Sequence, residues 1–276
     1  MLIKENQPIL ISVDFSELSI AAIKQGYGLY RHLKSKLILA YIHSEKEVSR
    51  KAELDSLVEK VKKESLLEVE GLEIIGNVFE QLSLRAKELS SSLIVLGLNP
   101  NVRHKSLFGA SDLSKFIKHL PCPIITVRSP KAENVIKNII LPVDLTAETR
   151  EKVPIAVQIA KFYGAEIRIV SVFSPNNEKE ENELLPYLNQ IKKFVKEKGV
   201  NCTNKSIPTN NPAEAILDYA EKNNGDLIIQ MNKKDLSISE MLGGGGTISI
   251  KIIELSKIPV LSINPMERLS IASSIH

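Results

Sequence analysis

Short apolar runs alternate with longer amphipathic segments along nearly the whole chain. The runs have the length of strands and are apolar on both faces, as in Ile9-Leu10-Ile11-Ser12-Val13. The longer segments carry apolar residues at helical spacing, as in residues 17–33. Because strands of this kind alternate with helices, the pattern predicts a parallel sheet with helices on both faces, which is an α/β fold.

The predicted elements occur twice, in the same order. In the first copy we expect strands at residues 9–13, 36–42, 72–76, 92–97 and 121–127, and helices at 17–33, 46–66, 78–90 and 112–119. In the second copy we expect strands at residues 138–143, 165–173, 201–207, 226–231 and 258–263, and helices at 147–163, 180–198, 212–224 and 248–256. The pattern therefore predicts an internal repeat.

Particular residues support the repeat. The first strand of each copy ends in an aspartate, Asp14 or Asp144, and a serine or threonine two residues later is placed to cap the next helix. The last strand of each copy follows a proline, Pro123 or Pro259. A chain of 276 residues is also long enough for two domains. We expect domains at residues 1–134 and 135–276, each an open five-stranded parallel sheet with helices on both faces.

The order of the strands decides where a ligand would bind. Right-handed crossovers restrict the topology. If the chain reverses direction across the sheet after the third strand, the first and fourth strands become neighbours and their carboxyl ends frame a crevice. This arrangement predicts one candidate site at Asp14 and Gly97, and a second at Asp144 and Met231.

The loop after the fourth strand of the first domain has features of an anion-binding loop. Gly109-Ala110-Ser111 precedes a helix, and the free N–H groups and dipole of a helix N-terminus suit an anion. Residues 103–105, Arg-His-Lys, add positive charge. Ser111 would serve equally well as a simple helix cap, and the sequence leaves both interpretations open.

The corresponding loop of the second domain contains a run of four glycines, Gly243–Gly246, followed by Thr247. Such a run permits the backbone to approach a phosphate closely, and it equally permits mere flexibility. It matches neither a P-loop, because no Gly-Lys-[Ser/Thr] follows, nor the GxGxxG pattern.

Composition and charge exclude several classes of protein. The chain carries 19 basic and 16 acidic residues before Asn134, and 17 of each from there on, so neither half is basic enough to suggest a nucleic-acid surface. The longest apolar stretches have strand length, so no membrane span is predicted. Few cysteines, Cys122 and Cys202, and no apolar run of signal length after Met1 favour the cytoplasm.

No constellation of catalytic residues is visible. The histidines form no ligand-spaced cluster with Cys, Asp or Glu, so the sequence predicts neither a zinc nor an iron site. A hydrolase or transferase needs an activated nucleophile, an acid/base pair or a metal site. We therefore expect no catalytic residues and no enzymatic activity.

Taken together, these segments resemble the universal stress protein family in its tandem two-domain form. The resemblance rests on Ile11-Ser12-Val13-Asp14-Phe15-Ser16, on residues 93–97 and on residues 119–124, and it extends from about residue 8 to residue 264. It implies two Rossmann-like domains of the adenine nucleotide alpha hydrolase-like type. It also implies a cytoplasmic protein of the stress response that binds ATP or another adenine nucleotide, with or without Mg, as a sensor.

The resemblance also implies a set of nucleotide-binding residues. Nucleotide-binding members of the family hold ATP with the region of the first-strand Asp, an apolar residue of the second strand and a Gly-x2-Gly-x9-Gly-[Ser/Thr] segment. Carried over by position, the set is Ser12, Val13, Asp14, Ile42, Gly97, Asn99 and Ser111 in the first domain, and Pro142, Val143, Asp144, Val172, Gly246 and Thr247 in the second.

Both glycine segments depart from the family pattern. Pro100 and Ala110 replace two glycines in the first domain, and Met231 replaces the first glycine in the second, where the spacing to Gly246 is also two residues longer. Proline removes a backbone donor, and alanine adds a methyl group where the backbone must approach a phosphate. These departures support an alternative hypothesis, a nucleotide-free scaffold of the same fold that binds an unknown protein partner.

The resemblance further implies how the two domains associate. In the family the fifth strands pair across a dimer, so the two domains are expected to form an internal pseudo-dimer through residues 124–127 and 260–263. Such pairing would cover sheet edges that are otherwise exposed. Association of the whole chain into a homodimer is compatible with this arrangement.

Overall fold

A computed structural model describes residues 3–98, 110–130, 135–146, 149–175, 177–232 and 247–265 of the chain. Unit 1 consists, in chain order, of β1 (Ile9–Val13), α1 (Glu17–Leu33), β2 (Leu37–His43), α2 (Lys51–Ser65), β3 (Val69–Ile75), α3 (Val78–Glu88), β4 (Leu93–Gly97), α4 (Ala110–Lys118) and β5 (Ile124–Val127). Unit 2 consists of β6 (Asn138–Val143), α5 (Thr149–Tyr163), β7 (Glu166–Phe173), α6 (Glu178–Glu197), β8 (Cys202–Pro208), α7 (Pro212–Lys222), β9 (Leu227–Met231), α9 (Ile248–Leu255) and β10 (Val260–Ile263). The repeated order of strands and helices that the sequence predicts is confirmed.

The strands of the described residues form one ten-stranded sheet in the order β3-β2-β1-β4-β5-β10-β9-β6-β7-β8. Neighbouring strands within each unit are parallel, and β5 and β10 join the two units in antiparallel fashion. Ile125 lies opposite Leu261 at this junction. Because these two residues occupy equivalent positions in the repeat, a pseudo-twofold axis passes between them, and the internal pseudo-dimer that the family resemblance implies is confirmed.

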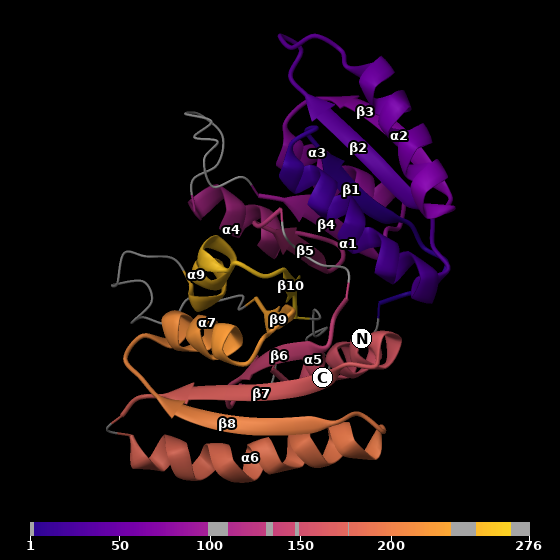
Figure 1. Ribbon diagram of the computed structural model, residues 1–276. Coiled ribbons are helices and arrows are strands. Elements are labelled where there is room, and N and C mark those ends of the chain that lie inside the picture. The colour runs from indigo at the N-terminus through magenta and orange to yellow at the C-terminus, as the bar shows by residue number, and fades with distance from the viewer. Residues whose placement is uncertain are drawn as a thin grey trace, which may run out of the picture.

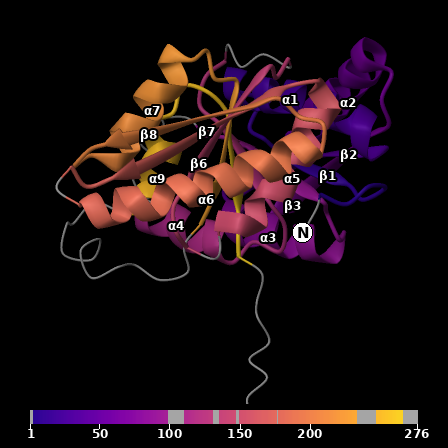
Figure 2. The same ribbon diagram turned by 90° about the horizontal axis from the view of Figure 1, so that it is seen from below.

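Two apolar layers hold the helices against the sheet. One layer lies between the sheet and α1, α2, α5 and α6, and the other between the sheet and α3, α4, α7 and α9. Figure 1 shows unit 1 above unit 2, with α4 and α9 close to the junction, and Figure 2 shows α6 running across the middle of the view. Both faces of the sheet are therefore covered, as the apolar strands predict.

The units also contact each other through α1 and α5. The His32 ring stacks on Phe162 with 4.8 Å between ring centroids, and Tyr163 lies against Gly28 of α1. The backbone N–H of Ile3 donates to Oε1 of Gln158 at 2.9 Å, and Nε2 of Gln158 donates back to the Ile3 carbonyl at 2.9 Å. The N-terminal segment of unit 1 is thus tied to a helix of unit 2.

A second tie joins unit 2 to α4. Nδ2 of Asn264, just after β10, donates to the carbonyls of Ile117 at 2.7 Å and Leu120 at 3.2 Å. These carbonyls lie at and just beyond the C-terminus of α4, where helices leave unpaired acceptors. The asparagine of one unit therefore satisfies the helix end of the other.

The largest difference from the sequence prediction concerns α2, which begins at Lys51 rather than near residue 46. Residues before it form a turn in which the backbone N–H and Oγ of Ser44 donate to Oε2 of Glu47. β3 begins at Val69, three residues earlier than predicted. Helix α4 begins at Ala110, so Ser111 lies in its first turn and does not precede it.

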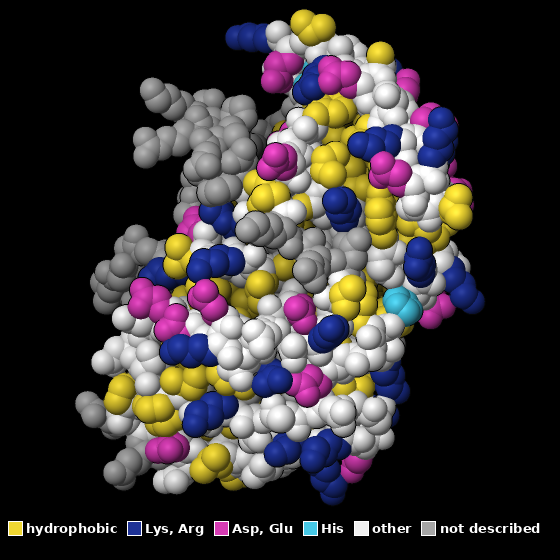
Figure 3. All heavy atoms as spheres, in the orientation of Figure 1, with side chains coloured by type: hydrophobic (Ala, Val, Ile, Leu, Met, Phe, Trp, Pro, Cys, Tyr) yellow, Lys and Arg dark blue, Asp and Glu magenta, His cyan; other side chains and the backbone are white. Residues whose placement is uncertain are grey.

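On the face of the molecule drawn in Figure 3, positive and negative side chains are interspersed over the described residues. In the part of the chain that the structure describes, no helix is both long enough and apolar enough to cross a membrane.

Candidate functional site

The first candidate site lies where the strand order of unit 1 reverses. β1 pairs with β2 on one side and with β4 on the other. The connection after β1 therefore leads toward β2, and the connection after β4 leads in the opposite direction, toward β5. Ile11 is opposite Val95, and two residues further along, β1 and β4 end at Val13 and Gly97. The predicted neighbourhood of Asp14 and Gly97 is therefore present, at the kind of position where open α/β sheets bind ligands.

Asp14 shapes the turn that leads from β1 into α1. Its Oδ1 accepts hydrogen bonds from the backbone N–H of Ser16 at 2.9 Å and from the Ser16 hydroxyl at 2.5 Å. Ser16 in turn caps α1 by accepting from the N–H of Ser19 at 3.2 Å. Between them, Phe15 has a φ of 64°, a left-handed conformation that is uncommon for an aromatic residue. The turn is thus held by side chains as well as by backbone.

The close packing of α1 against the end of β4 requires a glycine at position 97. A Cβ on this residue would lie 2.8 Å from the backbone C and O atoms of Leu18 and 3.0 Å from the backbone N of Ser19. Only a glycine lets the first turn of α1 lie this close to the end of β4. At the equivalent position unit 2 has Met231, which is buried.

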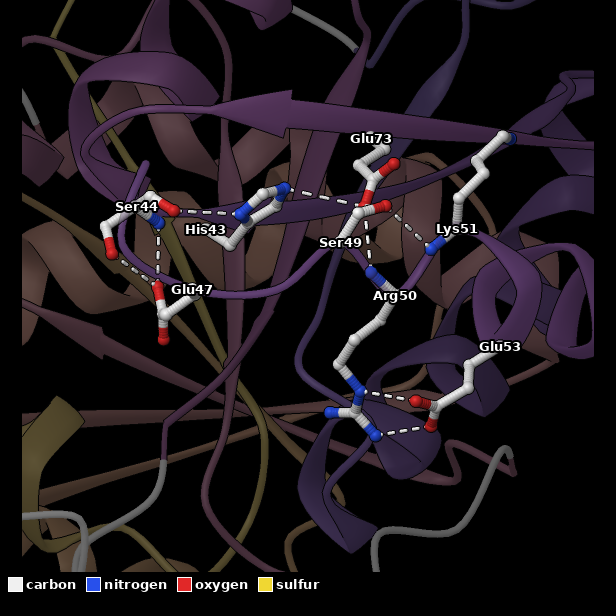
Figure 4. Close-up of polar contacts among 8 residues, drawn as sticks. All are labelled: His43, Ser44, Glu47, Ser49, Arg50, Lys51, Glu53 and Glu73. Carbon is white, nitrogen blue, oxygen red and sulfur yellow. Dashed lines mark hydrogen bonds and ion pairs between the residues drawn. The ribbon is translucent and has the colours of Figure 1, made fainter.

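A cluster of side chains, which we call the β2–α2 cluster, lies beside this turn on the α2 side of the sheet. It consists of Phe15, Tyr41, His43, Ser49, Arg50, Glu53 and Glu73, of which Figure 4 draws the last five. The Phe15 ring lies 5.1 Å from Tyr41, and the Arg50 guanidinium lies 4.0 Å from the centroid of Phe15. Arg50 also forms a two-pronged ion pair with Glu53.

Glu73 supplies a cap for α2 from a neighbouring strand. The N-cap residue Arg50 makes no capping bond with its own side chain, and the Ser49 hydroxyl accepts from the N–H of Lys51 at 3.3 Å. Oε1 of Glu73 accepts from the N–H of Arg50 at 3.0 Å and from the Ser49 hydroxyl at 2.7 Å. Nε2 of His43 lies 3.4 Å from the same oxygen. A carboxylate at a helix N-terminus is stabilised by the free N–H groups and by the helix dipole.

The β2–α2 cluster lies on the opposite face of the sheet from two of the predicted ligand residues, Ser12 and Ile42. Successive side chains of a strand alternate between its faces. Val13 and Tyr41 pack in the layer that contains α1 and α2, whereas Ile42 packs in the layer that contains α3 and α4. By the same alternation Ser12 is on the α4 side. Ser12 and Ile42 therefore share the face from which α4 rises.

The second candidate site has the same topology and different contacts. Oδ1 of Asp144 accepts from the backbone N–H of Thr146 at 3.0 Å, from the Thr146 hydroxyl and from the Thr149 hydroxyl at 2.6 Å. Arg150 lies over the ring of Tyr187 at 5.0 Å, and burial is the main cause that raises the pKa of Tyr187. Asp144 is half-buried, whereas Asp14 is exposed.

Thr247 begins α9 as its N-cap. The Thr247 hydroxyl accepts from the N–H of Ile250 at 3.3 Å and lies 2.8 Å from the Ser249 hydroxyl, and the residue is buried. At the end of β9, Nδ2 of Asn232 donates to Oδ1 of Asn264 at 3.0 Å. The threonine that the resemblance assigns to phosphate binding is therefore already occupied as a helix cap.

The structure brings most of the predicted residues to the carboxyl ends of the strands at the two candidate sites. Ser12, Val13, Asp14, Ile42 and Gly97 lie at or next to the carboxyl ends of β1, β2 and β4. Pro142, Val143, Asp144 and Val172 lie at the corresponding ends in unit 2, and Thr247 precedes α9. Asn99 and Gly246 lie outside the described residues, and for Ser111 the structure describes only the backbone.

Sequence reasoning missed the β2–α2 cluster. Phe15 adjoins a predicted residue, so its position was visible, but nothing in the sequence pairs His43 or Arg50 with Glu73 on a separate strand. The equivalents of Tyr41, His43 and Glu73 in unit 2 are Ser171, Phe173 and Ser206, as the strand register shows. The cluster is thus specific to unit 1.

Neither cysteine is suited to nucleophilic chemistry. Burial raises the pKa of Cys122 to about 12 and that of Cys202 to about 11. Both thiols are therefore protonated near neutral pH, and the thiolate is the reactive form. Among the described residues no group of three or more His, Cys, Asp or Glu side chains is placed to hold a metal ion.

Comparisons with known proteins agree with this architecture. A model of the universal stress protein family matches the chain twice, over residues 5–128 and 136–264. A universal stress protein from Archaeoglobus fulgidus DSM 4304 superposes with a TM-score of 0.70 at 14% identity, covering 96% of this chain and 98% of its own. A functionally unknown protein from Pseudomonas aeruginosa PAO1 superposes with a TM-score of 0.71 at 18% identity, covering 95% and 94%. The comparison with curated proteins gave no significant match.

At these identities the solved structures show a shared fold. The family model goes further, because its two matches leave only short segments of the chain uncovered and coincide with the two units of the sheet. The chain therefore belongs to the universal stress protein family, as a tandem of two domains.

Proposed function

We propose that this protein binds an adenine nucleotide at unit 1 and acts as a cytoplasmic sensor in the stress response. The observation that carries the proposal is the reversal of strand order at β1 and β4, which places Asp14 and Gly97 at the mouth of one crevice. Ligands of open α/β sheets bind outside the carboxyl ends of the strands at such a point. Family membership supports the same location.

The contacts of Asp14 fit a ligand that carries hydrogen-bond donors. Both of its turn bonds end on Oδ1, and the side chain is exposed, so Oδ2 remains as an acceptor for a ribose hydroxyl or an adenine amino group. Helix α4 follows β4 and therefore begins on the carboxyl side of the sheet. Its N-terminus would favour the negative charge of a phosphate.

Unit 2 is the weaker site in this proposal. Asp144 accepts three hydrogen bonds on one oxygen and is half-buried, so less of it is available to a ligand. Met231 fills the position of Gly97, and the Thr247 hydroxyl caps α9. These three features favour unit 2 as the half that supports unit 1 and presents a surface to a protein partner.

We propose a binding role without catalysis. The aspartates at both sites accept hydrogen bonds from neighbouring hydroxyl and N–H groups and so act as structural acceptors in their turns. Both cysteines are buried and protonated. A sensor needs only a ligand-dependent change of state, and the crevice supplies the ligand contact.

The test is to release and identify small molecules from natively purified protein, and to measure thermal unfolding with ATP and with AMP, each with and without Mg. A ligand that binds only the folded chain raises the melting temperature, and at a given concentration a tighter ligand raises it more. Asp14→Asn keeps an oxygen acceptor for the turn and removes the charge. We expect it to reduce the nucleotide shift, and Asp144→Asn to leave most of it.

Asp55→Asn is the matched control, because Asp55 is exposed on α2 and its change removes the same charge. A shift that both Asp14→Asn and Asp55→Asn reduce equally would contradict a site at Asp14. The absence of any released nucleotide and of any thermal shift would reject nucleotide binding. The nucleotide-free scaffold would then be the better hypothesis.

A further inference from the structure

A second concave site lies in unit 2, away from the nucleotide crevice. The groove has a volume of about 470 Å³ and lies between β7, β8 and α7. We call it the β8 groove, and its lining residues are Arg168, Thr203, Asn204, Lys205, Ile207, Tyr219 and Asn223. Arg168 is near the start of β7, and Asn223 follows the C-terminus of α7. The groove therefore runs along β8, from Thr203 near its amino end to Ile207 near its carboxyl end, in the unit that does not hold the proposed nucleotide site.

Three contacts orient the side chain of Arg168, which is one of the residues that line this groove. Nε of Arg168 donates to Oδ1 of Asn138 at 3.1 Å, Nη1 donates to Oδ1 of Asn223 at 3.1 Å, and Nη2 pairs with Glu166. A guanidinium carries five N–H donors, so these three contacts leave two. The side chain is 28% exposed, which leaves the remaining donors within reach of a ligand.

Further polar groups converge on the same place. Lys205 lies on the neighbouring strand, is exposed and takes part in no ion pair among the described residues. Tyr219 contacts Thr203 through its hydroxyl, and burial raises the pKa of Tyr219, so this hydroxyl is neutral and can donate. Arg168 and Lys205 outweigh the single carboxylate of Glu166, and the groove carries a net positive charge.

The repeat provides an internal comparison, because unit 1 has the same fold without these charges. The strand register places Ile38 and Leu72 at the positions of Arg168 and Lys205. Counting from the caps of α3 and α7 places Leu89 at the position of Asn223. Ile38 is buried, and Leu72 and Leu89 pack against the same apolar layer. The fold therefore needs only aliphatic side chains here.

The charged version of the groove costs free energy that the fold does not require. Taking an arginine partly out of water is unfavourable unless its hydrogen bonds are replaced. In unit 2 two asparagines and a glutamate provide the replacement hydrogen bonds and the ion pair. Side chains that orient a charged group in this way are typical of a site that recognises an ion of opposite charge.

We propose that the β8 groove binds a small organic anion. Its phosphate or carboxylate group lies between Arg168 and Lys205, with the Tyr219 hydroxyl as a further donor. The apolar part of the ligand lies against Ile207 and the Tyr219 ring. Because the groove lies in unit 2, this site is separate from the nucleotide site proposed at unit 1.

Protection of the sheet edge accounts for only part of the arrangement. β8 is the last strand of the sheet, and lysine and proline in edge strands discourage the addition of a further strand. Lys205 and Pro208 fit that role. Arg168 lies on the adjacent inner strand and Asn223 follows a helix, so edge protection explains neither of them.

The test is calorimetric titration of the full chain with phenyl phosphate, benzoate and inorganic phosphate at constant ionic strength. Phenyl phosphate and benzoate share the ring and differ in the anionic group, so they separate a preference for phosphate from one for carboxylate. Lys205→Leu and Arg168→Lys are the informative variants, the first because it introduces the residue of unit 1. The second keeps the charge and removes the planar fork.

We expect at least one ring-bearing anion to bind, and each variant to weaken it at least tenfold. Lys193→Leu, which removes an exposed lysine of α6, is the matched control and should leave the affinity unchanged. Circular dichroism would establish that the variants are folded. Failure of all three anions to bind the wild-type chain would overturn the proposal, as would equal weakening by Lys193→Leu. If Lys205→Leu instead leaves binding intact and makes the chain self-associate, Lys205 only protects the edge of β8.

Discussion

Gly97 and Met231 occupy equivalent positions at the ends of β4 and β9, and they place different demands on the helix that begins nearby. At Gly97 the backbone of Leu18 and Ser19 fills the space that a side chain would need. At Met231 the side chain itself is buried in the layer shared with α5. One position in the repeat therefore has two solutions, close backbone packing in unit 1 and side-chain packing in unit 2.

This difference predicts the effect of adding one methyl group at Gly97. Gly97→Ala would place a Cβ 2.8 Å from backbone atoms of α1, which cannot move aside as a flexible side chain can. Overpacking of this kind costs about 1–3 kcal/mol, so we expect a loss of that size in the free energy of unfolding, measured by urea denaturation.

Met231→Leu is the comparison variant for this experiment, because a swap of similar volume in a core costs less than about 1.5 kcal/mol. Equal stability of Gly97→Ala and the wild-type chain would show that α1 can shift away from β4. The glycine would then be free for another role, such as close approach to a ligand.

At the level of single residues the sequence showed where the crevices lie and less of what fills them. The apolar run that ends in Asp14 was enough to place that residue at a strand end, because the side chain follows the strand directly. The packing of Gly97 against Leu18 depends on how α1 lies over the sheet, which no local pattern encodes. The contact between Glu73 and Arg50 joins separate elements and has no sequence signature.

Helix α2 shows how an element can depend on a side chain from elsewhere in the fold. Arg50 precedes the helix without a capping side chain, and Glu73 of β3 provides the acceptor instead. This external cap also fixes the position of Arg50, whose guanidinium lies over Phe15 in the turn beside Asp14. The start of α2 and the turn at the candidate site are therefore linked through one carboxylate.

The link predicts a graded response to changes at Glu73. Glu73→Gln keeps an acceptor oxygen and removes the charge, whereas Glu73→Ala removes both. Loss of a cap costs about 0.5–2 kcal/mol and loss of the favourable charge about 0.3–1 kcal/mol. We expect the free energy of unfolding to fall in the order wild type, Gln, Ala, and amide exchange to increase in residues 44–54.

Glu70→Gln is the control for this series, because Glu70 is on the same strand and pairs with Lys36 at the surface instead of capping a helix. It should leave amide exchange at the start of α2 unchanged. If Glu73→Ala leaves it unchanged as well, the N-terminus of α2 is held by other contacts.

The same contact explains why one helix start was predicted five residues too early. Residues 46–50 are polar or charged apart from Val48, and they continue the amphipathic pattern of the helix without interruption. The helix begins only where Glu73 meets it, and that carboxylate belongs to a strand that follows the helix. The first helix of unit 1, in contrast, has its own cap at Ser16, and its predicted bounds of 17–33 agree with the structure.

The two units of the whole molecule meet along more than one line of contact. β5 and β10 join the sheets, α1 and α5 stack through His32 and Phe162, and Asn264 holds the end of α4. Each of these contacts joins residues that are far apart in the chain. The relative position of the units therefore rests on β-sheet pairing, aromatic stacking and helix capping together.

The stacked histidine predicts that the free energy of unfolding depends on pH. Burial lowers the pKa of His32 below its ordinary value of 6.5, so the folded chain binds a proton there less readily than the unfolded chain does. As the pH falls below 6.5 and through the lowered pKa, the unfolded state gains protons first and the free energy of unfolding decreases. We expect His32→Phe, which keeps a ring on Phe162, to lose less stability between pH 7.5 and pH 5 than the wild-type chain.

Urea denaturation at the two pH values measures the effect, and His119→Gln at the exposed end of α4 is the control. The control should follow the wild-type chain at both pH values. An identical pH dependence for His32→Phe and the wild-type chain would show that the proton is taken up elsewhere.

The antiparallel junction of β5 and β10 also has a consequence for how the protein can evolve. In a dimer of two identical chains every substitution appears twice, once on each side of the axis, so a change that suits one crevice is imposed on both. Here a covalent connection joins the two halves, and a substitution in one leaves the other as it was. The position of Tyr41 in unit 1 is taken by Ser171 in unit 2, and the position of Arg168 in unit 2 is taken by Ile38 in unit 1. Because the two halves belong to one chain, each can change its sequence separately. One half can therefore keep an inherited site while the other acquires a new one.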